Sequence, residues 1–71
     1  MNIIEAKIIQ TINKENIPDG TYDALWSGYL IEIFLSDESY LELKVDNGIR
    51  TINAPCIVKI NNGEIEVEMV R

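Results

Sequence analysis

The fold of this chain is decided by residues 56–69, which read CIVKINNGEIEVEM. Asn-Gly in a two-residue loop supplies the positive φ angles of a type I′ turn, and this turn matches the twist of the flanking strands. With Asn62 and Gly63 as the loop, six apolar residues share one face in facing pairs: Ile60 and Ile65, Val58 and Val67, Cys56 and Met69. On the other face Lys59 meets Glu66, an opposite-charge pair that stabilises by roughly a few tenths of a kcal/mol. These features predict a β-hairpin.

The middle of the chain is also predicted to be extended. Residues 21–26 place Tyr22, Ala24 and Trp26 on one face. After Ser27-Gly28 the apolar residues fall instead on odd positions, namely Tyr29, Ile31, Ile33 and Leu35. We interpret the glycine at this change of parity as a β-bulge or sharp bend of the kind that curls a sheet into a barrel.

Turn signals divide the rest of the chain. Residues 36–39 are predicted to turn into a strand at 40–45, whose apolar residues again lie on odd positions. Because odd positions must face odd positions across this hairpin, its loop should have three or five residues rather than four. Asp46-Asn47-Gly48 indicates a further turn. Asn53-Ala54-Pro55 is predicted to form a corner outside the sheet, because proline cannot donate to a mid-sheet ladder.

Residues 2–13 fit two interpretations. Ile4, Ile8 and Ile12 form a helical stripe, yet with Ala6 they also alternate with polar residues as in a strand. The many β-branched isoleucines favour the strand. The predicted fold is therefore mainly β, a small five-stranded antiparallel sheet curled into an SH3-like or OB-like barrel. The alternative is an α+β fold with residues 2–13 as a helix on a four-stranded sheet.

Length and composition narrow the class of protein. Seventy-one residues form a single domain, 1–71, and a chain of this size is marginally stable without additional help. With one cysteine and no histidine it has neither an intrachain disulfide nor a four-ligand zinc site, so we expect no cofactor. Stability must come from the apolar core or from burial against another copy, which leaves a homo-oligomer open.

The sequence also suggests a compartment. No apolar run approaches the roughly 20 residues of a membrane span. The first residues lack the basic and apolar regions of a secretory signal. A free cysteine without disulfides fits a reducing environment. We expect a cytoplasmic protein without membrane contact.

Catalysis is not indicated. Without histidine the chain has no ordinary general base near neutral pH. Its carboxylates, such as Asp37-Glu38, are expected at a turn tip or on outward strand faces rather than in a pocket that raises their pKa. Cys56 is expected to point inward, away from any cation that would activate it, and is interpreted as a core thiol. We expect a protein that is not an enzyme.

The charge pattern favours a protein partner. A net charge of −6 repels nucleic acid and anionic lipid, so we expect no direct nucleic-acid binding and a partner with a basic surface. Acidic residues also simply keep small proteins soluble. The acidic candidates are Glu64, Glu66 and Glu68, which share one strand face at about 7 Å spacing, twice the strand rise. This face resembles a row of phosphates; the alternative is a solvated outer face that protects an edge strand.

The aromatic candidates for partner contact are Tyr22, Trp26, Tyr29 and Tyr40. Tyrosine and tryptophan are enriched at interface hot spots because they combine a large rigid area with a polar tip. Trp26 has an alternative role as the anchor of the core. For each of Tyr29 and Tyr40 there are two alternatives, a position at the edge of the core and a position on a contact surface.

One segment resembles known proteins. Residues 17–29, IPDGTYDALWSGY, followed by Gly48-Ile49-Arg50 and Pro55-Cys56-Ile57-Val58, resemble small uncharacterised proteins encoded by bacteriophages. The resemblance covers about half of the chain and transfers no functional residue. It implies an accessory protein that blocks a host protein, such as a nucleic-acid-binding defence factor. The alternatives are a structural protein that assembles into a homo-oligomer, and small-molecule binding between protomers.

Overall fold

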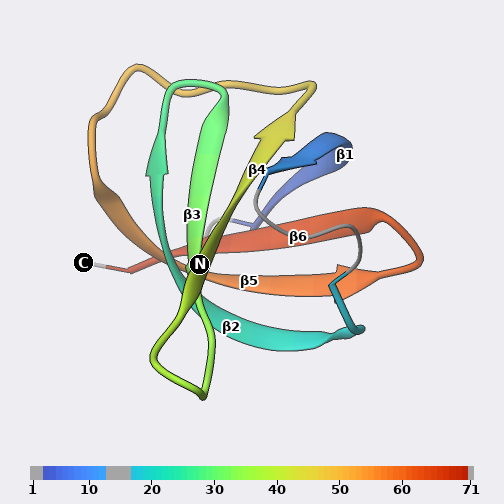
Figure 1. Ribbon diagram of the computed structural model, residues 1–71. Helices are drawn as coiled ribbons and strands as arrows, with labels where there is room; N and C mark the ends of the chain where they lie inside the picture. Colours follow the sequence, from blue (N-terminus) through green and yellow to red (C-terminus); the bar gives the residue numbers. More distant parts are fainter. Residues whose placement is uncertain (1–2, 13–16, 71) are drawn as a thin grey trace.

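The computed structural model describes residues 3–12 and 17–70, which form a closed antiparallel β-barrel (Figure 1). The described strands are β1 (Ile3–Ile12), β2 (Gly20–Ser27), β3 (Leu30–Phe34), β4 (Tyr40–Val45), β5 (Ala54–Asn61) and β6 (Glu64–Met69). Their order around the barrel is β1-β4-β3-β2-β5-β6, and β6 pairs with β1 to close it. The predicted mainly-β fold is confirmed and is consistent with a small SH3-like or OB-like barrel. The helical alternative for residues 2–13 is wrong over the described residues 3–12.

The described barrel has six strands rather than the predicted five, because Ser27-Gly28 begins a hairpin turn and not a bulge. Ser27 pairs with Leu30 and Trp26 with Ile31, so the loop is Gly28-Tyr29. Gly28 has φ 58°, and a glycine with positive φ at the first loop position is typical of a type II′ turn. A two-residue loop pairs even positions with odd ones, which explains the change of parity without a bulge.

Two other hairpins follow the predicted register. Across β5 and β6, Ile60 faces Ile65, Val58 faces Val67 and Lys59 faces Glu66, and Asn62 and Gly63 have φ 52° and 80°. Across β3 and β4, Phe34 pairs with Tyr40, so residues 35–39 form a loop of five residues. Both predictions are confirmed.

Ala54 and Pro55 lie inside the sheet, opposite Trp26 and Leu25 of β2, so the predicted corner outside the sheet is wrong. Pro55 lies one position beyond the last β5–β6 pair, Cys56 with Met69. Its missing N–H therefore falls where that ladder ends, while its carbonyl accepts the Val70 N–H at 3.0 Å.

Strand β1 closes the barrel by changing partner along its length. Its first half pairs with β6, from Ile3 opposite Glu68 to Lys7 opposite Glu64. Its second half pairs with β4, and the register shifts between Ile8 and Gln10. The extra residue turns Ile12 to the outer side, opposite Glu42, so the expected alternation of Ile12 with Ile4 and Ile8 is wrong.

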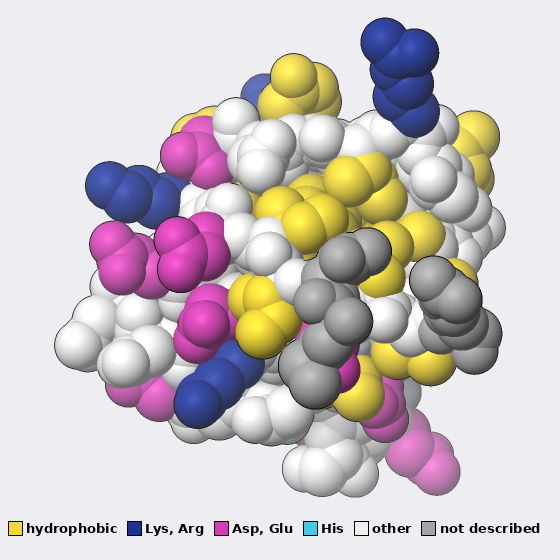
Figure 2. Space-filling view, turned by 180° about the vertical axis from the view of Figure 1, so that it is seen from behind, with side chains coloured by type: hydrophobic (Ala, Val, Ile, Leu, Met, Phe, Trp, Pro, Cys, Tyr) yellow, Lys and Arg dark blue, Asp and Glu magenta, His cyan; other side chains and the backbone are white. Residues whose placement is uncertain are grey.

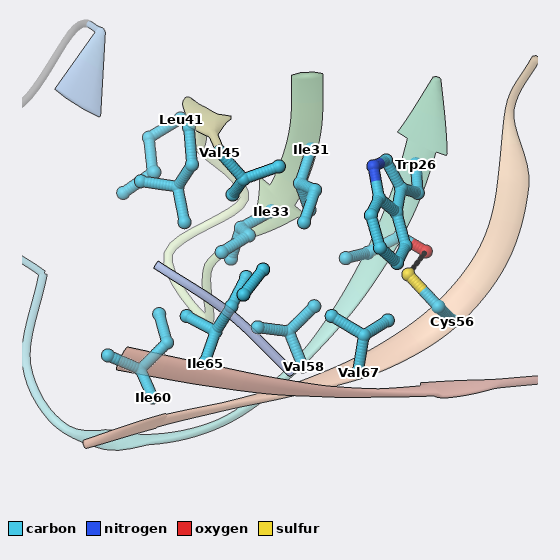
Figure 3. Packing of buried hydrophobic residues seen from close by; sticks show 13 residues of the cluster. Trp26, Ile31, Ile33, Leu41, Val45, Cys56, Val58, Ile60, Ile65 and Val67 are labelled. Atoms are coloured by element: carbon cyan, nitrogen blue, oxygen red, sulfur yellow. Dashed lines mark hydrogen bonds between the residues drawn. The ribbon is translucent and has the colours of Figure 1, made fainter. Parts of the chain in front are cut away.

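The barrel interior is filled by apolar side chains from all the described strands (Figure 3). The core cluster consists of Ala6, Ala24, Trp26, Ile31, Ile33, Leu41, Leu43, Val45, Cys56, Val58, Ile60, Ile65 and Val67. No polar or charged residue of the described part is buried. Burial of these apolar surfaces is the main stabilising term of the fold.

We predict that Gly63→Val destabilises the protein by about 1–2 kcal/mol, because a β-branched residue strains at positive φ. Space does not limit the substitution, since no heavy atom lies within 4 Å of an added Cβ. Urea denaturation measures the change. Asn62→Gly is the matched control, because glycine adopts the φ of 52° without strain. Equal stability of Gly63→Val and the native chain would show that residues 62–63 do not form this turn.

Candidate binding surface

The one thiol of the chain lies in the core and not at a reactive site. Cys56 is buried, and its Sγ–H donates to the Ala24 carbonyl at 3.6 Å (Figure 3). Burial raises the pKa of the Cys56 thiol from 9.0 to about 11, because the thiolate would lose its hydration. The interpretation as a core thiol is confirmed. No group of three or more acidic or cysteine side chains among the described residues is arranged to hold a metal ion.

The four aromatic candidates occupy different environments. Trp26 is fully buried, and its Nε1–H donates to the Gly28 carbonyl at 2.8 Å, so it anchors the core and the β2–β3 turn. Tyr22 packs partly against the core, and its hydroxyl donates to the Pro18 carbonyl at 2.6 Å. Tyr29 and Tyr40 are 59% and 51% exposed. Of the four candidates, only these two have more than half of their surface exposed.

The exposed tyrosines lie apart. Tyr29 is in the β2–β3 turn, and its ring lies close to Gly48. A Cβ atom added at Gly48 would lie 3.0 Å from this ring. Tyr40 begins β4, directly opposite the exposed Phe34 of β3. The two exposed candidates therefore lie at different places on the barrel, Tyr29 in the β2–β3 turn and Tyr40 at the start of β4.

The acidic candidates point outward from β6, but lysines oppose two of them. Glu64 lies opposite Lys7 of β1, and Glu66 lies between Glu5 of β1 and Lys59 of β5. An open groove of about 400 Å³ runs along this side, lined by Glu5, Ala6, Lys7, Asp46, Lys59, Asn61, Glu64, Ile65 and Glu66. We call the outer side of β1, β5 and β6 the mixed-charge face. Lys7 and Lys59 lie on the strands beside this row of negative charges, so the face as a whole is not uniformly acidic.

A second surface, which the sequence reasoning did not single out, covers the outer side of β2, β3 and β4. Its apolar members are Leu25, Leu30, Phe34, Tyr40 and, beside them on β1, Ile12. We call this surface the aromatic face. The signal in the sequence was the pair Leu30 and Phe34, which occupy outward, even positions of a strand whose odd positions are already apolar.

Apolar and charged side chains also gather separately on the side of the barrel that Figure 2 shows. Hydrophobic side chains form a patch near the centre of that view, and acidic and basic side chains lie together at one flank. The outer surface thus offers both apolar and ionic contacts.

Comparisons with known proteins give no relative from which a site can be transferred. No protein-family model, curated protein or solved structure matches the chain. The described residues contain no helix long and apolar enough to cross a membrane.

We predict that Cys56 makes the fold less stable at high pH. Because the folded state favours the neutral thiol, its stabilising contribution is complete below pH 9 and is lost as the pH rises through about 11. The free energy of unfolding, measured by urea denaturation across this window, should fall more steeply in the native chain than in Cys56→Ala. Every other group that titrates in this pH range is present in both the native chain and the Cys56→Ala variant. Parallel slopes would contradict the buried thiol.

Proposed function

We propose that this chain is a non-enzymatic binding protein that docks with its outer surface on a basic region of another protein. The observation that carries this proposal is the filled interior of the barrel. The core cluster contains apolar side chains and one buried thiol, so the groups available for recognition lie on the outer strand faces and in the turns.

The charge supports a basic partner. A net charge of −6 accelerates encounter with a basic surface and opposes approach to nucleic acid. The resemblance to small phage proteins adds a setting, in which the chain acts in the cytoplasm of an infected bacterium. We therefore propose an inhibitor of a host defence or nucleic-acid-binding protein.

Self-association is the second candidate, because apolar side chains are exposed on neighbouring strands. Phe34 and Tyr40 are 42% and 51% exposed and directly opposed. Assembly through a free strand edge has less support, since each described strand has two strand neighbours and only short stretches, such as Ile3–Lys7 of β1, are paired on one side alone. Light scattering on the purified chain separates the two candidates: a monomer favours a separate partner, and a closed ring or filament favours assembly.

An affinity pull-down from bacterial lysate, followed by mass spectrometry, tests the proposal. We expect a protein with a basic surface, recovered at low salt and released at high salt, because attraction between exposed charges is screened by salt. The purified pair must then bind directly. Failure of a purified candidate to bind, or binding that does not depend on salt, would contradict this function.

We predict that replacing Glu64, Glu66 and Glu68 by glutamine slows association with this partner and flattens its salt dependence. Long-range steering depends on total charge, so the effect is expected even if these residues lie outside the contact. Unfolding free energy should change by about 1 kcal/mol or less, because exposed ion pairs contribute little. Stopped-flow or surface-based kinetics measures the rate. An unchanged association rate would show that the acidic residues serve solubility alone.

A further inference from the structure

The aromatic face has exposed apolar side chains that the fold itself leaves uncovered. Phe34, Tyr40 and Leu30 are 42%, 51% and 39% exposed, although each is a strand residue within a paired ladder. Phe34 and Tyr40 face each other across β3 and β4, and Leu30 lies at the other end of β3. An apolar cluster on neighbouring strands is a feature of surfaces that bind partners.

Two carboxylates lie in the middle of these apolar residues. Glu32 of β3 is directly opposite Glu42 of β4. The next neighbour of Glu32 is Leu25 of β2, and the next neighbour of Glu42 is Ile12 of β1. The row across the four strands is therefore apolar, acidic, acidic, apolar, and both carboxylates are half-buried.

Among the residues that the structure describes, no cation lies directly opposite either carboxylate on a neighbouring strand. On the mixed-charge face Glu5 also faces Glu66, but Lys59 lies on the other side of Glu66. On the described aromatic face the one lysine is Lys44, which lies diagonal to Glu32 in the next row, opposite Leu30, and not between the two carboxylates. Like charges directly opposite each other destabilise a sheet, so the free fold gains nothing from Glu32 beside Glu42. A positive group from outside would relieve the repulsion.

We propose that the aromatic face binds a protein segment that inserts an arginine, flanked by apolar residues, between Glu32 and Glu42. This inference rests on the proposed function and names its contact surface. A guanidinium donates to two carboxylates in one plane and stacks on aromatic rings such as Phe34 and Tyr40. The apolar flanks of the segment cover Leu25, Leu30 and Ile12, and this excludes water from the ionic contact.

Nuclear magnetic resonance of the ¹⁵N-labelled full chain tests the proposal with a defined probe. The probe is acetyl-Leu-Arg-Leu-Arg-Leu-amide, and its matched control has citrulline, an uncharged analogue of arginine, at both arginine positions. We expect the arginine peptide to shift the amide signals of β3 and β4. Citrulline should weaken binding at least about tenfold, because it leaves the two carboxylates without a charged partner.

Variants of the chain give the second arm of the test. Glu32→Gln with Glu42→Gln should weaken peptide binding at least about tenfold, and Glu64→Gln with Glu66→Gln by no more than about twofold. The first variant should keep or raise the melting temperature, because it removes a repulsion, so a loss of binding cannot be attributed to unfolding.

The results that would contradict this proposal differ from those that would contradict the binding function. Signal shifts confined to β1, β5 and β6, equal binding of the citrulline peptide, or no shift up to about 5 mM peptide would each overturn the proposal. If the partner recovered from lysate binds Glu32→Gln/Glu42→Gln as well as the native chain, this face is wrong while the binding function stands. If no recovered protein binds directly, the proposed function itself fails.

Discussion

The double pairing of β1 is the constraint on which the rest of the structure depends. One strand hydrogen-bonds to β6 over its first half and to β4 over its second, and the register shift between Ile8 and Gln10 allows the change. Without it the β2–β3–β4 meander and the β5–β6 hairpin would meet only along β2 and β5. The core side chains of Leu43 and Val67 would then be exposed to solvent on one side.

Closure also determines where function can reside. A small barrel has room inside only for its own side chains, and here Trp26, with its indole N–H bonded to the Gly28 carbonyl, occupies part of that space. Because the sheet closes, its described strands offer only short unpaired edge stretches for β-augmentation by an added strand. What remains are the outer strand faces and the turns between strands. On the mixed-charge face Lys7 and Lys59 lie opposite Glu64 and Glu66, whereas on the aromatic face no described cation lies opposite Glu32 or Glu42, which are flanked by apolar side chains.

The features predictable from sequence were those set by local chemistry. Asn62-Gly63 specified the β5–β6 register, and alternation specified an odd loop before Tyr40. The wrong predictions arose where one local sequence pattern is compatible with two backbone geometries. A bulge and a two-residue loop both shift parity by one, so Gly28 did not distinguish them. Isoleucine at positions 8, 9 and 12 concealed the irregularity in β1. The pairing of Glu32 with Glu42 follows from a five-residue loop before Tyr40, one of the two loop lengths that alternation allowed, but the pairing of Ile12 with Glu42 is non-local and no local pattern contains it.

The most direct test of barrel closure is a nuclear Overhauser spectrum of the labelled chain, read along β1. The structure predicts cross-strand contacts from Ile4 to Val67 and also from Thr11 to Leu43 in the same molecule. Backbone protons of facing residues in antiparallel strands lie close enough to give strong signals. Both sets of contacts are expected together. Contacts to β6 alone, or to β4 alone, would mean an open sheet with an uncovered apolar face and would contradict the closed barrel.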